Sequence, residues 1–154
     1  MQIEPITQDG LGDLALLLAA PDGQYRDLPQ VVAHDDAPGH HGMAILCPQK
    51  IAEGPIQIST LERHPHSAQT FFAVSKTRWL VCLMPSQADG APDIGEARCF
   101  VAGIGDAVCI HTNVWHAGLT VLDADARIAM MMWRSQSGED GVVHTLETPL
   151  SFRL

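Results

Sequence analysis

Short apolar segments separated by turn signals fill the chain from residue 43 onward, and this spacing is the strongest constraint on its fold. Residues 56–60 (IQIST) alternate apolar and polar side chains, as a strand with one buried face does. Residues 78–84 (RWLVCLM) form a continuous apolar run of strand length that ends at a Pro- and Gly-rich stretch. Further runs of this kind occupy residues 43–47, 97–102, 107–110, 118–122 and 127–133. Seven or eight short strands at this spacing predict an all-β sandwich or barrel.

One segment ahead of these strands predicts a helix, at about residues 9–20. Thr7 or Asp9 can cap its start, and the Pro-Asp-Gly at residues 21–23 ends it. Residues 21–42 are rich in Gly, Pro, Asp and His, so we expect a loop there with room for one short strand. The chain has no internal repeat and no dividing linker, which predicts a single domain over residues 1–154.

Charge and cysteine usage limit the class of partner and the compartment. Nine basic and 18 acidic residues give a net charge of −9, which disfavours a nucleic-acid or anionic membrane partner. The apolar run at residues 14–20 is far shorter than the roughly 20 residues needed to span a bilayer. The first ten residues lack the basic region of a secretory signal. The four cysteines form no CxxC pair, which favours reduced thiols. We therefore expect a soluble cytoplasmic protein.

Two polar segments some fifty residues apart carry the candidate chemistry: residues 59–72 (STLERHPHSAQTFF) and residues 105–118 (GDAVCIHTNVWHAG). Eight histidines against two lysines already direct attention to metal ligands or acid/base groups. In a small barrel, residues two apart on a strand point to the same side. Glu62 and His64 would then face the interior together, and Gln69 could return to the same cavity from the next strand. The candidate site residues are Glu62, His64, Gln69, His111, Asn113 and His116.

The spacing of these residues resembles the two sequence signatures of the cupin barrels. The first signature runs His-x-His, three or four residues, then Glu. The second runs Gly, five residues, Pro-x-Gly, two residues, then His. The residues of this chain at the signature positions are, in order, Glu62, His64, Gln69, His111, Asn113 and His116. The resemblance implies a cupin-like β-barrel of the jelly-roll type, with both segments meeting at one end.

A closer resemblance is to the ureidoglycolate lyase family, also called ureidoglycolate hydrolase. Residues 61–71 (LERHPHSAQTF), 92–100 (PDIGEARCF) and 111–118 (HTNVWHAG) carry it. That family shows an ERHP segment with Gln five residues after the His, a PDL-like turn and a WHHP-like second segment. The resemblance implies a barrel, usually a homodimer, that splits ureidoglycolate into glyoxylate and urea in allantoin and purine degradation.

The chemistry of such a site leaves two alternatives open. A carboxylate, two imidazoles and an amide oxygen could hold a divalent cation with positions left for substrate. The same groups could instead bind an anionic substrate and move protons without a metal. On the resemblance, the catalytic residues and metal ligands are Glu62, His64, Gln69 and His116, and the substrate contacts are His111, Asn113 and Gln69. We expect the two histidines to do acid/base or metal-ligand work and Glu62 to orient a histidine or join a metal.

Several residues of this chain differ from the family pattern, and these differences leave other functions open. The Tyr and Arg that the family places around the first histidine of the second segment are Ile110 and Thr112 here. The family's HHP ends as Ala117-Gly118 after the second histidine, and Trp133 stands where an Asp is expected. Losing groups that grip a carboxylate or ureido group commonly changes the substrate. Besides the lyase, the alternatives are a metal-assisted cupin enzyme for another small carboxylate or ureido compound, and a non-catalytic cupin that binds a small ligand.

Overall fold

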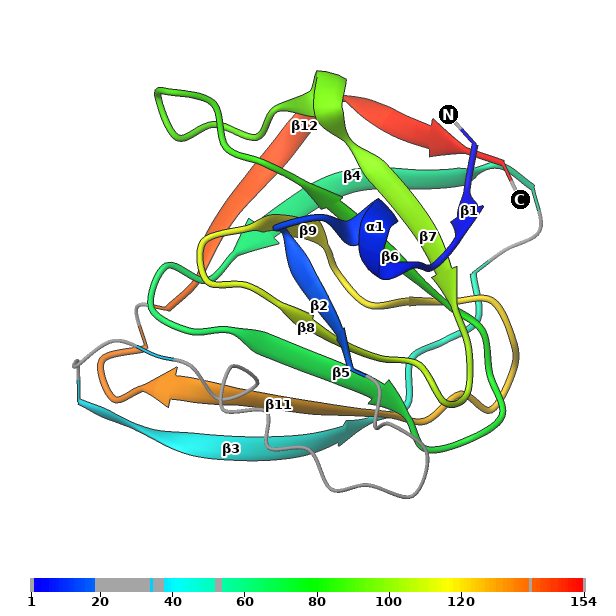
Figure 1. The fold of residues 1–154 in the computed structure, drawn as a ribbon, viewed down its shortest axis with the longest axis horizontal. Helices are drawn as coiled ribbons and strands as arrows, with labels where there is room; N and C mark the ends of the chain where they lie inside the picture. The colour runs from blue at the N-terminus through cyan, green and yellow to red at the C-terminus, as the bar shows by residue number, and fades with distance from the viewer. Residues whose placement is uncertain (1, 19–33, 35–37, 52–53, 139, 154) are drawn as a thin grey trace.

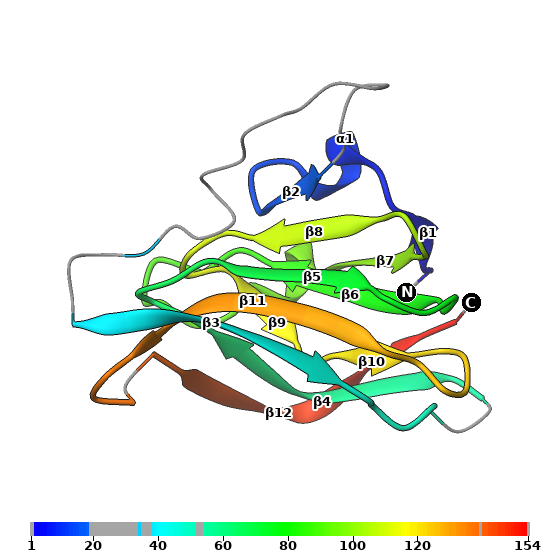
Figure 2. The same ribbon diagram turned by 90° about the horizontal axis from the view of Figure 1, so that it is seen from below.

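Two β-sheets face each other in the computed structural model, which describes residues 2–18, 34, 38–51, 54–138 and 140–153 (Figures 1 and 2). The seven-stranded sheet contains, in spatial order, β1 (Glu4–Pro5), β7 (Arg98–Ala102), β6 (Trp79–Met84), β9 (Trp115–Ala117), β4 (Ile56–Arg63) and β12 (Val142–Phe152), with β10 (Thr120–Val121) paired to β6. The five-stranded sheet contains β2 (Ala15–Leu18), β8 (Ala107–Ile110), β5 (Gln69–Ala73), β11 (Ile128–Ser135) and β3 (Gly39–Leu46). A 3-10 turn, η2 (Ile94–Glu96), precedes β7. The predicted all-β, cupin-like barrel is confirmed.

Strand β6 is buried on both of its faces, which explains its continuous apolar run. Alternate residues of β6 enter two different hydrophobic clusters. Trp79, Val81 and Leu83 pack between the two sheets, in a cluster that also contains Phe71 and Met130 of the five-stranded sheet. The opposite face of the seven-stranded sheet is covered by a second cluster made of Ile56, Ile58, Leu61, Leu80, Cys82, Met84, Ala97, Cys99, Trp115, Leu122, Leu150 and Phe152. A strand with two buried faces cannot show a period-two pattern.

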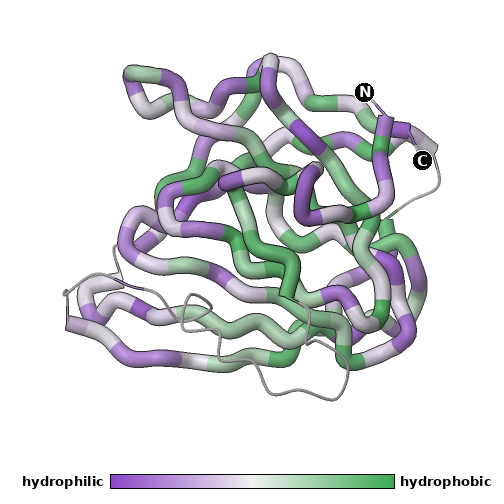
Figure 3. Tube along the Cα trace, viewed as in Figure 1, coloured by the Kyte–Doolittle hydropathy of each residue, from purple (hydrophilic) through white to green (hydrophobic). Residues whose placement is uncertain are grey.

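The prediction of a helix over residues 9–20 is wrong about its extent. The helix α1 covers only Gln8–Leu11, begins at the predicted cap Thr7 and ends at Gly12, whose φ is 55°. Residues 15–18 instead form β2, which pairs with β8, and residues 19–20 lie outside the described part of the chain. Figure 3 shows β2 as an uninterrupted hydrophobic stretch. Ala and Leu favour helices in isolation, but a short apolar run beside a sheet edge gains more by pairing and packing.

A long strand at the C-terminal end has no counterpart among the predicted segments. Strand β12 pairs with β4 along most of its length and has a register irregularity between Thr145 and Leu150. Most of its side chains are exposed, and only Leu150 and Phe152 are buried, so its apolar residues show no regular alternation. No helix in the described residues is long and apolar enough to cross a membrane.

Candidate functional site

The irregular pairing of β4 with β12 determines which way Glu62 points. Ile56 and Ile58 belong to the cluster on the outer face of the seven-stranded sheet, and so does Leu61. An unbroken strand would put Leu61 on the opposite face from Ile58, because side chains alternate. The register shifts next to Ile58, where the strand is therefore re-aimed. As a result Leu61 faces outward and Glu62 faces the five-stranded sheet.

Glu62 and His116 lie directly opposite each other on neighbouring strands. They are register partners in the antiparallel pair β4–β9, and Glu62 Oε1 lies 3.6 Å from His116 Nε2. The His116 side chain is 2% exposed and that of Glu62 is 37% exposed, so the carboxylate marks the side open to solvent. Hydrogen bonding to His116 lowers the pKa of Glu62, the charges of His116 and His64 add to this, and burial opposes it. Glu62 is therefore a carboxylate at neutral pH.

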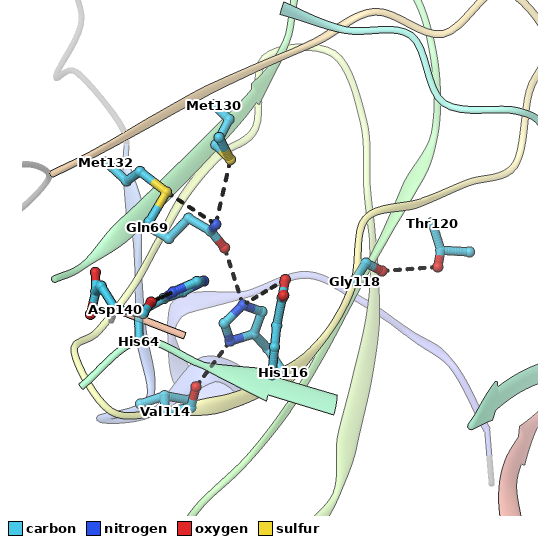
Figure 4. Close-up of polar contacts among 10 residues, drawn as sticks. His64, Gln69, Val114, His116, Gly118, Thr120, Met130, Met132 and Asp140 are labelled. Carbon is cyan, nitrogen blue, oxygen red and sulfur yellow. Dashed lines mark hydrogen bonds and ion pairs between the residues drawn. The ribbon is translucent and has the colours of Figure 1, made fainter. Parts of the chain in front are cut away.

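Gln69 reaches the same histidine from the other sheet. It is the first residue of β5, is buried, and its Oε1 lies 3.1 Å from His116 Nε2. Its amide nitrogen points to the sulfurs of Met130 and Met132 on β11, at 3.4 and 3.6 Å (Figure 4). Sulfur is a weak acceptor, so the strongest polar contact of this amide is the one with His116.

His64 follows the end of β4 and lies beside His116, with ring centroids 5.4 Å apart. Its Nδ1 lies 2.5 Å from the main-chain oxygen of Asp140 (Figure 4). Its Nε2 is buried and has no hydrogen-bond partner in the part of the chain that the structure describes. A buried ring nitrogen left without a partner is costly unless a substrate or a metal ion completes it.

The two histidines are held in the same way at Nδ1, by a main-chain oxygen. His116 Nδ1 lies 2.9 Å from the main-chain oxygen of Val114, as His64 Nδ1 does from that of Asp140. A carbonyl oxygen only accepts, so Nδ1 carries the hydrogen in both rings. Nε2 of His64 then bears a lone pair and has no partner among the described residues, whereas Nε2 of His116 faces the acceptor oxygens of Gln69 and Glu62. Ligating histidines in metalloproteins are typically oriented by such contacts. One ligand atom from each of Glu62, His64 and His116 lies within 4.8 Å of the others, so these three side chains could hold a cation.

The structure brings together four of the predicted site residues and places the other two at the edge of the loop before β9. His111 Nδ1 lies 2.9 Å from the main-chain oxygen of Asp13. Asn113 has a φ of 68°, and its side-chain oxygen accepts a hydrogen bond from Arg63. Its main-chain N–H donates to the carbonyl of His64 at 2.8 Å. Asn113 thus supports the backbone of His64, and its role as a substrate contact, like that of His111, stays a prediction.

Arg63 lies on the opposite face of β4 from Glu62, as its parity predicts. Its guanidinium stacks over the ring of Trp115 at 4.8 Å and donates to Asn113. Trp115 in turn donates its indole N–H to the main-chain oxygen of Gly90. These contacts tie together β4, β9 and the loop after β6, and they fix the strand ends that carry Glu62 and His116.

Sequence reasoning missed Asp140, which contacts the turn after His64 at three points. The residue lies more than seventy positions beyond that turn, in a polar stretch (SGEDG) that predicts only a loop. A single Asp in such a stretch gives no signal that it is 8% exposed. Only the fold reveals the contact.

Comparison with known proteins agrees with this geometry. The family model described as ureidoglycolate lyase matches residues 18–153. A putative ureidoglycolate lyase of Agrobacterium fabrum is 35% identical over 106 residues, which are 69% of this chain and 65% of that protein. The ureidoglycolate lyase of Schizosaccharomyces pombe is 31% identical over 99 residues, which are 61% of this chain and 52% of that protein. The match therefore spans less than two thirds of the length of either relative. The ureidoglycolate lyase of Rhodobacter capsulatus is 31% identical over 142 residues, covering 85% of this chain and 84% of that protein. This chain belongs to the ureidoglycolate lyase family.

Proposed function

We propose that the protein is a ureidoglycolate lyase that releases glyoxylate and urea, in allantoin and purine degradation. The observation that carries the proposal is the convergence of Glu62, His64, Gln69 and His116 from two sheets, in a chain of this family. Ionisable groups that converge beside an unpartnered ring nitrogen are a recurrent feature of acid/base sites.

The reaction needs a base, an acid and a group that keeps them in place. The base removes the proton of the hydroxyl on the carbon that bears the ureido nitrogen, the carbon–nitrogen bond breaks, and glyoxylate forms. The acid protonates the departing nitrogen, which leaves as urea. Nε2 of His64 has a free lone pair and suits the base. His116, when protonated on Nε2 beside the Glu62 carboxylate, suits the acid, and Gln69 holds its ring.

A divalent cation bound by Glu62, His64 and His116 is a second possibility, favoured by the closeness of their ligand atoms and by the lone pair on Nε2 of His64. Such an ion would act as a Lewis acid on the substrate oxygens. Gln69 stands where the cupin signature has Glu, so the site has one negative charge fewer than that signature supplies. Substituting Gln69→Glu should therefore tighten binding of Mn²⁺ or Zn²⁺ to the metal-stripped protein, as measured by titration calorimetry.

The proposal is tested by glyoxylate release from ureidoglycolate, with chelator or with added divalent metal. His64→Ala and His116→Ala should each lower kcat/KM by about 10²–10⁴-fold, the typical contribution of a positioned acid or base. His40→Ala is the matched control, because His40 is an exposed histidine at the end of β3. Activity that survives the chelator supports the metal-free alternative, and activity that needs metal supports the other. A wild-type protein that releases no glyoxylate under either condition refutes the proposal.

We also propose a homodimer in the cytoplasm. Met43 and Ile45 on the edge strand β3 are 66% and 52% exposed, and apolar side chains at a sheet edge favour self-association. Cys82 and Cys99 are register partners yet remain free thiols, as is usual in a reducing compartment. Light scattering after size exclusion measures the mass of the particle, and a mass of about 17 kDa would exclude the dimer.

A further inference from the structure

Asp140 joins the segment before β12 to the turn that carries His64. One carboxylate oxygen accepts the main-chain N–H of His66 at 2.8 Å, and the other accepts the hydroxyl of Ser67. The main-chain oxygen of the same residue accepts from Nδ1 of His64. Asp140 and Ser67 are 8% and 1% exposed, so these contacts are shielded from water. One residue thus contacts three of the four residues from 64 to 67.

These contacts are of two kinds: two are made by the carboxylate of Asp140 and one by its main-chain oxygen. The two side-chain contacts anchor Asp140 to the turn, because a buried carboxylate strongly favours the position in which donors satisfy it. The anchor fixes where the main-chain oxygen lies. That oxygen points at the imidazole of His64, and as a pure acceptor it selects the ring form with hydrogen on Nδ1.

No other polar contact of the His64 ring within the described residues could make this selection. Its Nε2 is without a partner, and the hydrogen bond from Asn113 goes to its main-chain oxygen. The neighbouring ring of His116 lies 5.4 Å away between centroids and is tilted by 41°. Without Asp140, the lone pair that faces the site would be shared between two ring forms.

We propose that Asp140 is a positioning residue: its carboxylate locks the 64–67 turn, and its main-chain carbonyl keeps His64 with hydrogen on Nδ1 and the lone pair on Nε2. The inference rests on the proposed function in one respect, namely that His64 acts as base or metal ligand. The orientation of the ring itself does not depend on the reaction.

The matched pair of variants is Asp140→Ala and Asp140→Asn. Alanine removes both acceptors. Asparagine keeps an oxygen for the N–H of His66, and its NH2 group can donate to Ser67, whose hydroxyl turns to accept. Asp106→Ala is the control, because the Asp106 carboxylate holds a different turn by accepting the N–H of Gly103 at 2.8 Å. It tests whether loss of any turn-holding Asp has the same effect.

The first measurement is the ¹⁵N spectrum of the histidine rings in the metal-stripped protein, since protonated and unprotonated ring nitrogens differ widely in shift. The His64 signals are identified by their loss in His64→Gln. In the wild type, Asp140→Asn and Asp106→Ala, Nδ1 of His64 should appear protonated and Nε2 unprotonated. In Asp140→Ala the two should move toward each other. The second measurement is activity: kcat should fall about 10- to 100-fold in Asp140→Ala with KM little changed, and recover in Asp140→Asn.

The outcomes separate the inference from the function. A His64 ring form and kcat that are unchanged in Asp140→Ala overturn the inference and leave the lyase proposal standing. An equal loss in Asp106→Ala also overturns it. A wild type without turnover, together with the expected spectral change in Asp140→Ala, refutes the lyase proposal and supports the positioning role. If Asp140→Ala does not fold, Ser67→Ala removes one anchor and should shift the His64 signals in the same direction; no shift there overturns the inference.

Discussion

The effect of the site's charges on the Glu62 carboxylate can be measured through the pH dependence of the unfolding free energy. Its pKa is lowered in the folded protein, chiefly by hydrogen bonding to His116. A carboxyl group with a lowered pKa stabilises the folded state above its unfolded pKa of about 4.3, and that contribution disappears as pH falls through the folded value. Substituting Glu62→Gln removes the titration. The difference in unfolding free energy between wild type and variant should therefore be largest near pH 7 and shrink below about pH 4.

Urea unfolding of both proteins at several pH values, with chelator present, measures this difference. Glu147→Gln is a useful control, because Glu147 is an exposed residue of β12 and its loss removes one carboxylate elsewhere. A difference that stays constant or grows on acidification would contradict the interpretation that His116 stabilises the ionised form of Glu62.

Residue types and their spacing in the sequence predicted four side chains of the candidate site. Glu62, His64, Gln69 and His116 follow from two short segments, and the structure brings them together, while their catalytic roles stay predictions. Two things could not be found this way. The inward direction of Glu62 goes with a register shift between β4 and β12, and the contacts of Asp140 depend on where a polar loop returns. Both are contacts between distant parts of the chain, which local pattern does not encode.

At the scale of elements, the exposed edge strand β2 is completed by one side chain of α1. Strand β2 lies at the end of the five-stranded sheet, so one of its sides has no neighbouring strand among the described residues. The amide of Gln8 donates to the main-chain oxygen of Ala15 at 3.1 Å and accepts from the N–H of Leu17 at 2.7 Å. It thereby pairs with the strand as a residue of a neighbouring strand would. Figure 2 shows α1 and β2 together above β8.

Substituting Gln8→Ala should open this edge. Water replaces exposed hydrogen bonds in part, so the loss in unfolding free energy should be about 0.5–1.5 kcal/mol for each bond or less. The sharper expectation is faster hydrogen exchange at the amide of Leu17, with little change in β5 at the centre of the sheet. Gln57→Ala is the control, because Gln57 bonds to Ser151 on the other sheet. An unchanged rate at Leu17 would show that Gln8 does not protect the edge.

The strands themselves were predictable to different degrees, for physical reasons. Residues 78–84 and 127–133 read as strands because both of their faces are largely buried and a long helix does not fit between the flanking turns. Residues 14–20 read as a helix because Leu and Ala fill them, and only pairing with β8 decides against it. Strand β12 escaped prediction because its apolar residues do not alternate regularly and only two of its eleven residues, Leu150 and Phe152, are buried.

At the scale of the whole molecule, the two hydrophobic clusters close both faces of β6, at the centre of the seven-stranded sheet, to solvent. Two buried cysteines test this: Cys82 and Cys99 are register partners on β6 and β7 in the outer cluster. A third buried cysteine, Cys109, lies on β8 of the five-stranded sheet. Hydrogen bonding with Cys99 and burial raise the pKa of the Cys82 thiol well above its ordinary value, and burial raises that of Cys109. Thiols react as thiolates, so both burial and the raised pKa should slow the reaction of Cys82 and Cys109 with thiol reagents. Cys47 is exposed.

A thiol reagent such as DTNB should therefore release about one equivalent from the native protein, since one of the four free cysteines is exposed and three are buried. All four should react in urea. The fast native reaction should vanish in Cys47→Ser, which assigns it to that residue. Rapid reaction of Cys82 or Cys99 in the native protein would mean that the outer face of the sheet opens easily. In that case the outer cluster would not hold the strands that carry Glu62 and His116 rigidly enough to fix the geometry of the site.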